Sequence, residues 1–319
     1  MSSHQPHYIS PNGTVYIAGG QDNNCTISVC PVELSVYGYR PSLGLSSALI
    51  ALYAICCIIQ VAFGWRYKTW GFMTAMLLGC VDEILGYVGR IMMYQNPFEH
   101  PGFIMQIVLI TIGPVFFSAA VYVMLYQIIN YISIKHSRFN PRLFYYIFIP
   151  CDVVSLILQA VGGAMSSTSN GSSEAGVNIA LAGLVLQVVT LFVFMCFGVD
   201  YFVRSRSVWR SARIPKKFTV FVVFLSLATI LILVRCCYRV YELNQGYSRD
   251  SEALRDQSLF IGLEAIMVIL SAYALVVAHP GPVFQTGQRH VVEEEVVEQK
   301  QMGNISGSSE SSELAGGRV

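Results

Sequence analysis

Apolar residues gather in seven long runs along this chain, separated by polar loops. Each run has at least about 20 predominantly apolar residues, which is the length that a helix needs to cross a bilayer. The runs are rich in Leu, Ile, Val, Phe and Ala and are too long for strands. They are Ser42–Gly64, Gly71–Met93, Phe103–Asn130, Leu143–Ala164, Val177–Val203, Lys217–Tyr238 and Gln257–Ala278. The pattern predicts seven transmembrane helices.

Positive charge alternates between the loops. The basic residues of the loops after the first, third and fifth runs are Arg66, Lys68, Lys135, Arg138, Arg142, Arg204, Arg206, Arg210, Arg213, Lys216 and Lys217. By contrast, Tyr94–Gly102 and Met165–Gly176 contain no Lys or Arg, and acidic neighbours dilute Arg249 and Arg255 in the sixth loop. Because basic loops remain in the cytosol, we expect the N-terminus outside and the C-terminus in the cytosol.

The composition fits an all-α integral membrane protein. Hydrophobic residues make up 54% of the 319 residues and charged residues 12%, about half the charged fraction of a soluble domain. A net charge of +1 argues against a general nucleic-acid binder. We expect an extracellular or lumenal segment over residues 1–41, a seven-transmembrane-helix bundle over 42–278 and a disordered cytosolic tail over 279–319. The tail begins with the helix-ending His279-Pro280-Gly281-Pro282 and continues with acidic and Ser/Gly-rich sequence.

The segment before the first run has features of an outer, oxidising compartment. Asn12 and Asn24 begin N-glycosylation sequons, as does Asn170 in a loop on the same predicted side. We expect a disulfide between Cys25 and Cys30, with two free or separately modified thiols as the alternative. The seven other cysteines suit small packing positions and show no metal-ligand spacing. We expect the plasma membrane, and leave a vacuolar or other internal membrane open.

Polar side chains recur inside the apolar runs, where a charge costs at least about 2.5 kcal/mol unless it faces a cavity or a partner. Spacings of three, four and seven residues place many of them on shared helical faces. The principal candidates for ligand binding and transport are Glu83, Tyr87, Arg90, Asp152, Gln159, Arg235, Arg239, Glu242 and Glu264. Secondary candidates are Asp82, Ser118 and Tyr122. We expect the charged residues and Gln159 to converge on one interior polar site.

The predicted topology also gives depths. At 1.5 Å per residue, Glu83 and Asp152 fall near the midplane, whereas Arg90 and Arg235 fall about 10 Å nearer the outside. This arrangement fits either structural ion pairs or a polar cavity that opens outward. The two descriptions overlap, because the charges of an empty cavity also pair.

The same residues form an ordered series of motifs. They are Glu83-x-x-Gly86-Tyr87-x-x-Arg90, Pro114-x-x-x-Ser118-x-x-x-Tyr122, Asp152-x-x-Ser155-x-x-x-Gln159-x-x-Gly162-Gly163, Arg235-x-x-Tyr238-Arg239-x-x-Glu242-x-x-x-Gly246, Glu264 and His279-Pro280-Gly281. From about Tyr37 to Phe284 the chain resembles the fungal lipid-translocating exporters, the 7-aminocholesterol-resistance family, which includes sphingoid long-chain-base exporters. The resemblance implies a seven-span protein that exports or flips amphipathic lipids and contributes to resistance against toxic lipids and drugs.

The residue chemistry fits such a substrate. A sphingoid base joins an ammonium head to an apolar tail, so midplane carboxylates would hold the head, while the arginines would hold a phosphate or modulate carboxylate protonation. The chain has no Walker-type phosphate loop, so we expect no ATP hydrolysis, and no cofactor is implied. The expected partners are membrane lipids and an amphipathic lipid or lipid-like substrate, and the sequence identifies no protein partner.

Two other function classes share parts of this pattern. A seven-helix receptor or lipid and stress sensor has the same topology, but the third run ends in Asn130-Tyr131-Ile132 without an acidic-Arg-aromatic switch. Lipid-dependent coupling to a G protein would distinguish such a sensor from an exporter. An intramembrane zinc enzyme needs histidine ligands within the membrane, and all six histidines lie in loops, in termini or at a span end. We therefore expect a lipid translocator that is not an enzyme.

Overall fold

The computed structural model describes residues 7–9, 13–17, 24–35, 37–132, 140, 142–168, 174–206, 216–245 and 257–284. Asn12, Asn170, Gly246 and the tail beyond Phe284 lie outside these ranges, as do several basic loop residues. The predictions made for these positions stay predictions.

Within the described ranges, seven helices are long and apolar enough to cross a membrane, which confirms the predicted bundle. They and one short 3-10 helix are η1 (Val32–Leu34), α1 (Leu43–Tyr67), α2 (Trp70–Gln95), α3 (His100–Ile132), α4 (Arg142–Thr168), α5 (Glu174–Arg204), α7 (Lys216–Asn244) and the last span, composed of α9 (Gln257–Leu259), η3 (Phe260–Ile266) and α10 (Met267–Val277). Most helices extend beyond the apolar runs, and α7 reaches Asn244 rather than Tyr238. The reason is that a helix which also crosses the polar headgroup region needs more residues than the hydrocarbon core alone.

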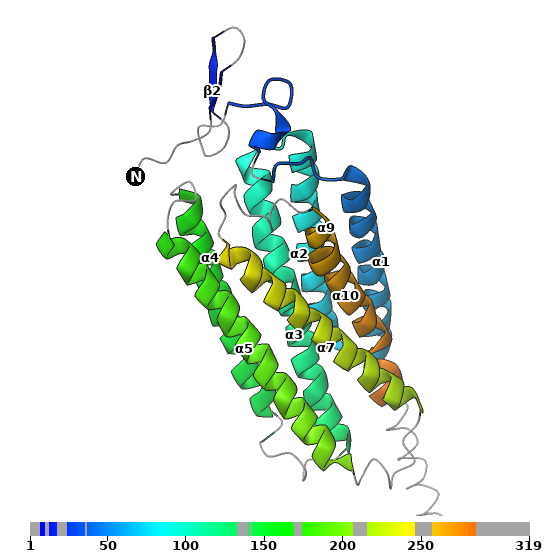
Figure 1. The fold of residues 1–319 in the computed structure, drawn as a ribbon. Coiled ribbons are helices and arrows are strands. Elements are labelled where there is room, and N and C mark those ends of the chain that lie inside the picture. The colour runs from blue at the N-terminus through cyan, green and yellow to red at the C-terminus, as the bar shows by residue number, and fades with distance from the viewer. Residues whose placement is uncertain are drawn as a thin grey trace, which may run out of the picture.

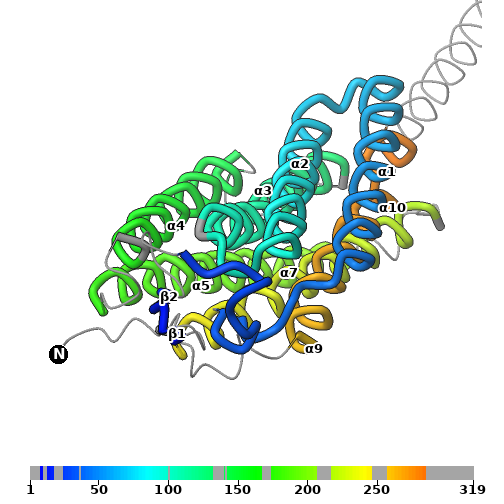
Figure 2. The backbone as a smooth tube through the Cα atoms, turned by 90° about the horizontal axis from the view of Figure 1, so that it is seen from above, coloured from blue at the N-terminus to red at the C-terminus, as the bar shows by residue number. Residues whose placement is uncertain are grey.

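The bundle has two sides joined by one crossing helix. Seen from above, α4 and α5 lie on one side and α1, α2 and α10 on the other (Figure 2). α7 crosses diagonally between them and contacts α3, α5 and α10 (Figure 1). Large apolar side chains such as Ile58, Phe192 and Val199 remain exposed on the outside, as suits contact with lipid.

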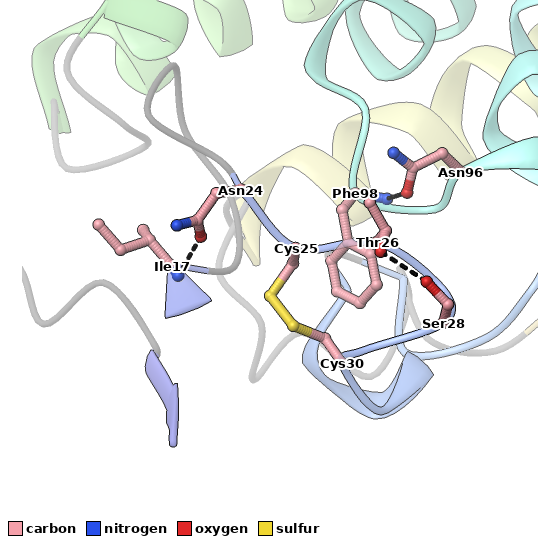
Figure 3. The surroundings of a disulfide bond; sticks show 8 residues. All are labelled: Ile17, Asn24, Cys25, Thr26, Ser28, Cys30, Asn96 and Phe98. Carbon is pink, nitrogen blue, oxygen red and sulfur yellow. Dashed lines mark hydrogen bonds between the residues drawn. A yellow bond between two sulfur atoms is a disulfide. The ribbon is translucent and has the colours of Figure 1, made fainter. Parts of the chain in front are cut away.

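A small hairpin and a disulfide-closed loop precede the bundle. β1 (His7–Ile9) pairs antiparallel with β2 (Val15–Ile17), so two short strands are added to the predicted all-α fold. Cys25 and Cys30 are joined by a disulfide, and Phe98 from the turn between α2 and α3 packs against it (Figure 3). The N-terminal segment therefore rests on the end of the bundle where α2 ends and α3 begins.

Glycines set the closest helix contacts. A Cβ on Gly162 of α4 would lie 2.4 Å from the backbone nitrogen of Ala180 and 2.5 Å from the carbonyl oxygen of Gly176, both in α5. A Cβ on Gly86 of α2 would lie 2.5 Å from the side chain of Ile110 in α3. Small residues at these points let the backbones approach, which is how membrane helices gain packing energy without a hydrophobic effect between them.

Replacing Gly162 with Ala should therefore destabilise the α4–α5 pair by about 1–3 kcal/mol, because the new methyl group overpacks against backbone atoms that cannot rotate away. The next residue, Gly163, has open space around it, so Gly163→Ala is a matched control that should stabilise the helix by up to about 1 kcal/mol. Thermal unfolding of both purified variants in detergent measures the difference. Equal melting temperatures would contradict the tight contact.

Candidate functional site

Four charged side chains form an ion-pair network between α7 and the last span. Nη2 of Arg235 lies 3.1 Å from Oε1 of Glu264, and both side chains are almost fully buried. Nη1 of Arg239 lies 3.5 Å from Oε2 of Glu264. The same nitrogen lies 2.5 Å from Oε2 of Glu242, one turn further along α7. Each of these charges therefore has an opposite charge beside it, as burial requires.

A proline in α3 provides the acceptor that holds Arg235. Pro114 has no backbone N–H, so the carbonyl of Ile110, four residues earlier, lacks its usual helical donor. Nη2 of Arg235 donates to this carbonyl at 2.6 Å. The neighbouring Thr111 accepts a hydrogen bond at Oγ1 from Nη2 of Arg239, at 2.8 Å. One stretch of α3 thus fixes both arginines of α7.

Glu264 lies within a π-helix, Phe260–Ile266, that interrupts the last span. π-helices are rare, and their wider turn occurs frequently at functional sites. Glu264 is buried in the middle of this segment and reaches both arginines from there. Hydropathy gives no sign of an extra residue in a helical turn, so this feature had no signal in the sequence.

Arg90, near the end of α2, contacts aromatic residues, and no carboxylate within the described ranges pairs with it. Its Nη2 donates to the hydroxyl of Tyr39 at 3.0 Å, and its guanidinium carbon lies 3.8 Å from the ring centroid of Phe260. Beside it, the hydroxyl of Tyr37 accepts a hydrogen bond from Nε2 of Gln106 at 3.1 Å. Burial raises the pKa of both tyrosine hydroxyls, although Arg90 opposes the shift, so both remain protonated at neutral pH.

We call Tyr37 and Tyr39 the tyrosine lid, and the end of the bundle that they cover the lid end. Both residues precede the first apolar run, where a hydropathy analysis looks for no site residues. The only sequence signal for them was that the family resemblance begins at about Tyr37.

Among the buried charged candidates in the described ranges, Glu83 has the fewest hydrogen bonds and ion pairs. It is fully buried, and neither carboxylate oxygen has a hydrogen-bond partner among the described residues. A Cβ on Gly113 of α3 would lie 2.7 Å from its Oε1, so this glycine leaves the room that the carboxylate occupies. Arg90 lies seven residues further along α2, about 10 Å by helical rise, with the unsatisfied hydroxyl of Tyr87 between them. An unpaired buried carboxylate is costly, so a bound cation or proton gives its largest gain here.

The remaining candidates form a second polar group near α4 and α5. The hydroxyl of Tyr122 donates to Oδ2 of Asp152 at 2.9 Å. Nε2 of Gln159 donates to Oε1 of Gln187 at 3.1 Å, and Gln187 in turn reaches the sulfur of Cys236 in α7 at 3.7 Å. This group therefore approaches α7 from the side opposite the last span.

The structure divides the residues that we expected to meet in one interior site. We call the first group the charge cluster, and its members are Glu83, Arg90, Arg235, Arg239, Glu242 and Glu264. Asp152 and Gln159 belong to the second group instead, because helical spacing identifies a face but not the helix that faces it. Ser118 donates to the carbonyl of Pro114 at 3.1 Å, and Asp82 is half-exposed and joins neither group. The ion pairs and the tyrosine lid also make the charge cluster closed, where we had left an outward-opening cavity as one possibility.

The segment that carries the charge cluster matches a known protein family. Residues 76–287 match the family model described as RTA1-like protein. The chain belongs to the RTA1-like family. The match confirms the resemblance carried by the motifs, and it includes every member of the charge cluster. No solved structure matches this chain.

Several relatives from Saccharomyces cerevisiae are similar over much of their length. The sphingoid long-chain base transporter RSB1 of strain Lalvin EC1118 / Prise de mousse is 28% identical over 294 residues, covering 79% of this chain and 75% of that protein. Protein RTM1 is 28% identical over 292 residues, covering 77% of this chain and 91% of RTM1. Protoporphyrin uptake protein 1 of strain ATCC 204508 / S288c is 29% identical over 176 residues, covering 53% and 56%.

The ion-pair network predicts unequal costs for its two glutamates. Glu264→Gln removes the charge shared by Arg235 and Arg239 and should reduce the free energy of unfolding by about 3–5 kcal/mol. Glu242→Gln is the matched control. It should reduce the free energy of unfolding by less, because Arg239 keeps its contacts with Glu264 and Thr111. Thermal unfolding in detergent measures both variants. Similar losses for the two would show that Glu264 is not the centre of the network.

Proposed function

We propose that this protein translocates an amphipathic lipid or lipid-like molecule between membrane leaflets, with sphingoid long-chain bases as the first class to test. The observation that carries the proposal is Glu83, a buried carboxylate without a hydrogen-bond partner among the described residues. A cationic lipid head group supplies the missing partner. The relative named a sphingoid long-chain base transporter supports the same class of molecule.

Two members of the charge cluster, Glu83 and Arg90, have no ion pair among the described residues and are therefore the groups that a ligand would meet. The other four members pair with one another, whereas Glu83 and Arg90 lie about 10 Å apart on α2. Nε and Nη1 of Arg90 have no hydrogen-bond acceptor among the described residues. A sphingoid base carries an ammonium, which suits Glu83, and hydroxyl oxygens, which can accept from Arg90. A phosphate on the head group would suit Arg90 more strongly.

The tyrosine lid would control release of the bound lipid at the lid end of the bundle. Nη2 of Arg90 donates to Tyr39 in the closed structure, so a head group that binds the same guanidinium would compete with Tyr39 for its position. Binding of the head group at Arg90 would therefore weaken the hold of the lid. The closed state would keep the charge cluster away from water between transport events.

We further propose that the lid end faces away from the cytosol, with the plasma membrane as the expected location. The basic side chains of Arg66 and Arg204 lie near the helix ends opposite the lid, as the positive-inside rule requires. The disulfide between Cys25 and Cys30 lies at the lid end, where an oxidising compartment would preserve it.

Glycosylation mapping tests this orientation. Glycans should occur on Asn12, Asn24 or Asn170 and be absent from Asn304 in the tail, because only the lid side would meet the glycosylation machinery. Glycosidase treatment of single-sequon variants gives the measurement. A reporter fused after Val319 should be cytosolic, and an extracellular reading would overturn the orientation.

Glu83→Gln tests the transport role. The change keeps the side-chain shape, and Glu83 has no ion pair to lose within 4 Å among the described residues, so folded protein should reach the membrane at normal levels. Export of a labelled sphingoid base, and the tolerance of cells to it, should fall by about tenfold or more, as expected for loss of a charge-assisted hydrogen bond. Reconstituted liposomes with and without a proton gradient provide the rate measurement.

The neighbouring Asp82→Asn is the matched control for this experiment. It removes a carboxylate from the same helix at a half-exposed position outside the charge cluster, and should leave export unchanged. Normal export by Glu83→Gln would remove the proposed role of Glu83. Loss of folded protein in Glu83→Gln, with normal export per folded molecule, would reduce its role to stability.

A further inference from the structure

An apolar groove runs between α4 and α5, on the side of the bundle away from the charge cluster. Its volume is about 320 Å³, near the lower end for small-molecule sites. Leu143 and Ile147 of α4 and Val189 and Val193 of α5 line it, and all four side chains are exposed on the outer surface. The groove therefore opens sideways, toward the region that lipid chains occupy.

A buried carboxylate lies directly behind the α4 wall of the groove in sequence. Phe148 and Cys151 form part of its α4 wall, and Asp152 follows directly, one helical turn beyond Phe148. The ring of Tyr122 packs 5.6 Å from that of Phe148, centroid to centroid, while its hydroxyl donates to Oδ2 of Asp152. One aromatic residue thus contacts both the wall of the groove and the carboxylate.

Asp152 has unused hydrogen-bonding capacity. Its residue exposure is only 2%, and Oδ1 has no hydrogen-bond partner among the described residues. No arginine or lysine in the described part of the chain forms an ion pair with it, whereas the arginines of the charge cluster have other acceptors. A buried carboxylate in this state favours a ligand that brings a positive charge and N–H donors.

We propose that the groove and Asp152 form a binding site for a single-chain amphiphile with a protonated primary amine. The alkyl chain lies in the groove, and the ammonium donates to Oδ1 of Asp152. The tail then points toward the end of the bundle where α4 begins and α5 ends, and the head lies about 15 Å into the membrane helix, by the rise from Arg142 to Asp152. The site is separate from Glu83 and does not depend on the transport role proposed above.

This orientation gives the site a defined relation to the bilayer. A lipid in the leaflet beside the groove has its head at the membrane surface and its tail at the midplane. A molecule held at Asp152 has its head near the midplane and its tail toward that surface, which is the orientation of the opposite leaflet.

Photocrosslinking tests the site directly. The probe is a long-chain primary amine with a diazirine in its chain, bound to the purified protein in lipid nanodiscs, with crosslinked residues mapped by mass spectrometry. Crosslinks should fall on the groove residues of α4 and α5. An unlabelled amine should compete at least about tenfold better than an alcohol of equal chain length, from the charged hydrogen bond to Asp152.

Substitutions at Asp152 and in the groove test the binding of the head group and of the alkyl chain separately. Asp152→Asn should reduce the advantage of the amine over the alcohol to about twofold or less, since the amide oxygen lacks the negative charge that attracts the ammonium. Val193→Trp should fill the groove and abolish its crosslinks, whereas Val199→Trp, at an exposed position of α5 that does not line the groove, should leave them unchanged. The tryptophan pair keeps the test valid if Asp152→Asn fails to fold.

The outcomes are distinct. Equal competition by amine and alcohol would mean that the groove binds any alkyl chain and would overturn the role of Asp152. Crosslinks outside α4 and α5, or groove crosslinks that Val193→Trp does not remove, would overturn the site itself. Glu83→Gln should leave the crosslinks intact, so a failure of the transport proposal can be told apart from a failure of this one.

Discussion

The hydrogen bond from Arg235 to the carbonyl of Ile110 is the interaction on which the charge cluster depends. Pro114 leaves that carbonyl without its helical donor, and the hydrocarbon around the bundle offers no water to replace it. Arg235 satisfies the acceptor but brings a charge, which Glu264 neutralises. Glu264 then also contacts Arg239, and so α3, α7 and the π-helix are joined by one series of polar contacts. Each contact in this series thus gives a partner to a buried polar or charged group that would otherwise be costly to bury.

α7 brings the two polar groups of the bundle close to each other. Its diagonal course lets it contact α3 and α10 on one side and α5 on the other (Figure 1). Arg235 contributes to the charge cluster, while the next residue, Cys236, contacts Gln187 of the second group. A movement of α7 therefore changes both groups together. Glycines allow α2 to pack closely against α3, and α4 against α5. Each of these two helix pairs is therefore better suited to move as a unit around α7 than to separate.

The sequence was a good guide to the helices and to the polar residues within them, because hydropathy and burial cost act on each helix separately. It was a poor guide to which polar residues meet. Glu83 and Asp152 were expected at a similar depth, yet they face different neighbours. The π-helix around Glu264 leaves the hydropathy of the span unchanged, and Tyr39 precedes any apolar run. The groove beside Asp152 depends on the spacing of two helices, which no single helix encodes.

The balance of charges in the charge cluster has an electrical consequence. Three arginines and three glutamates, counted at their formal charges, sum to zero. The membrane potential then exerts no net force on the charge cluster when it moves as a unit, so in the proposed transport cycle the empty cluster would carry no net charge through the field. One bound ammonium changes this, since carrying one elementary charge across the membrane field involves about 2.3 kcal/mol per 100 mV. The voltage dependence of transport by the loaded protein would thus report the net charge of the bound lipid.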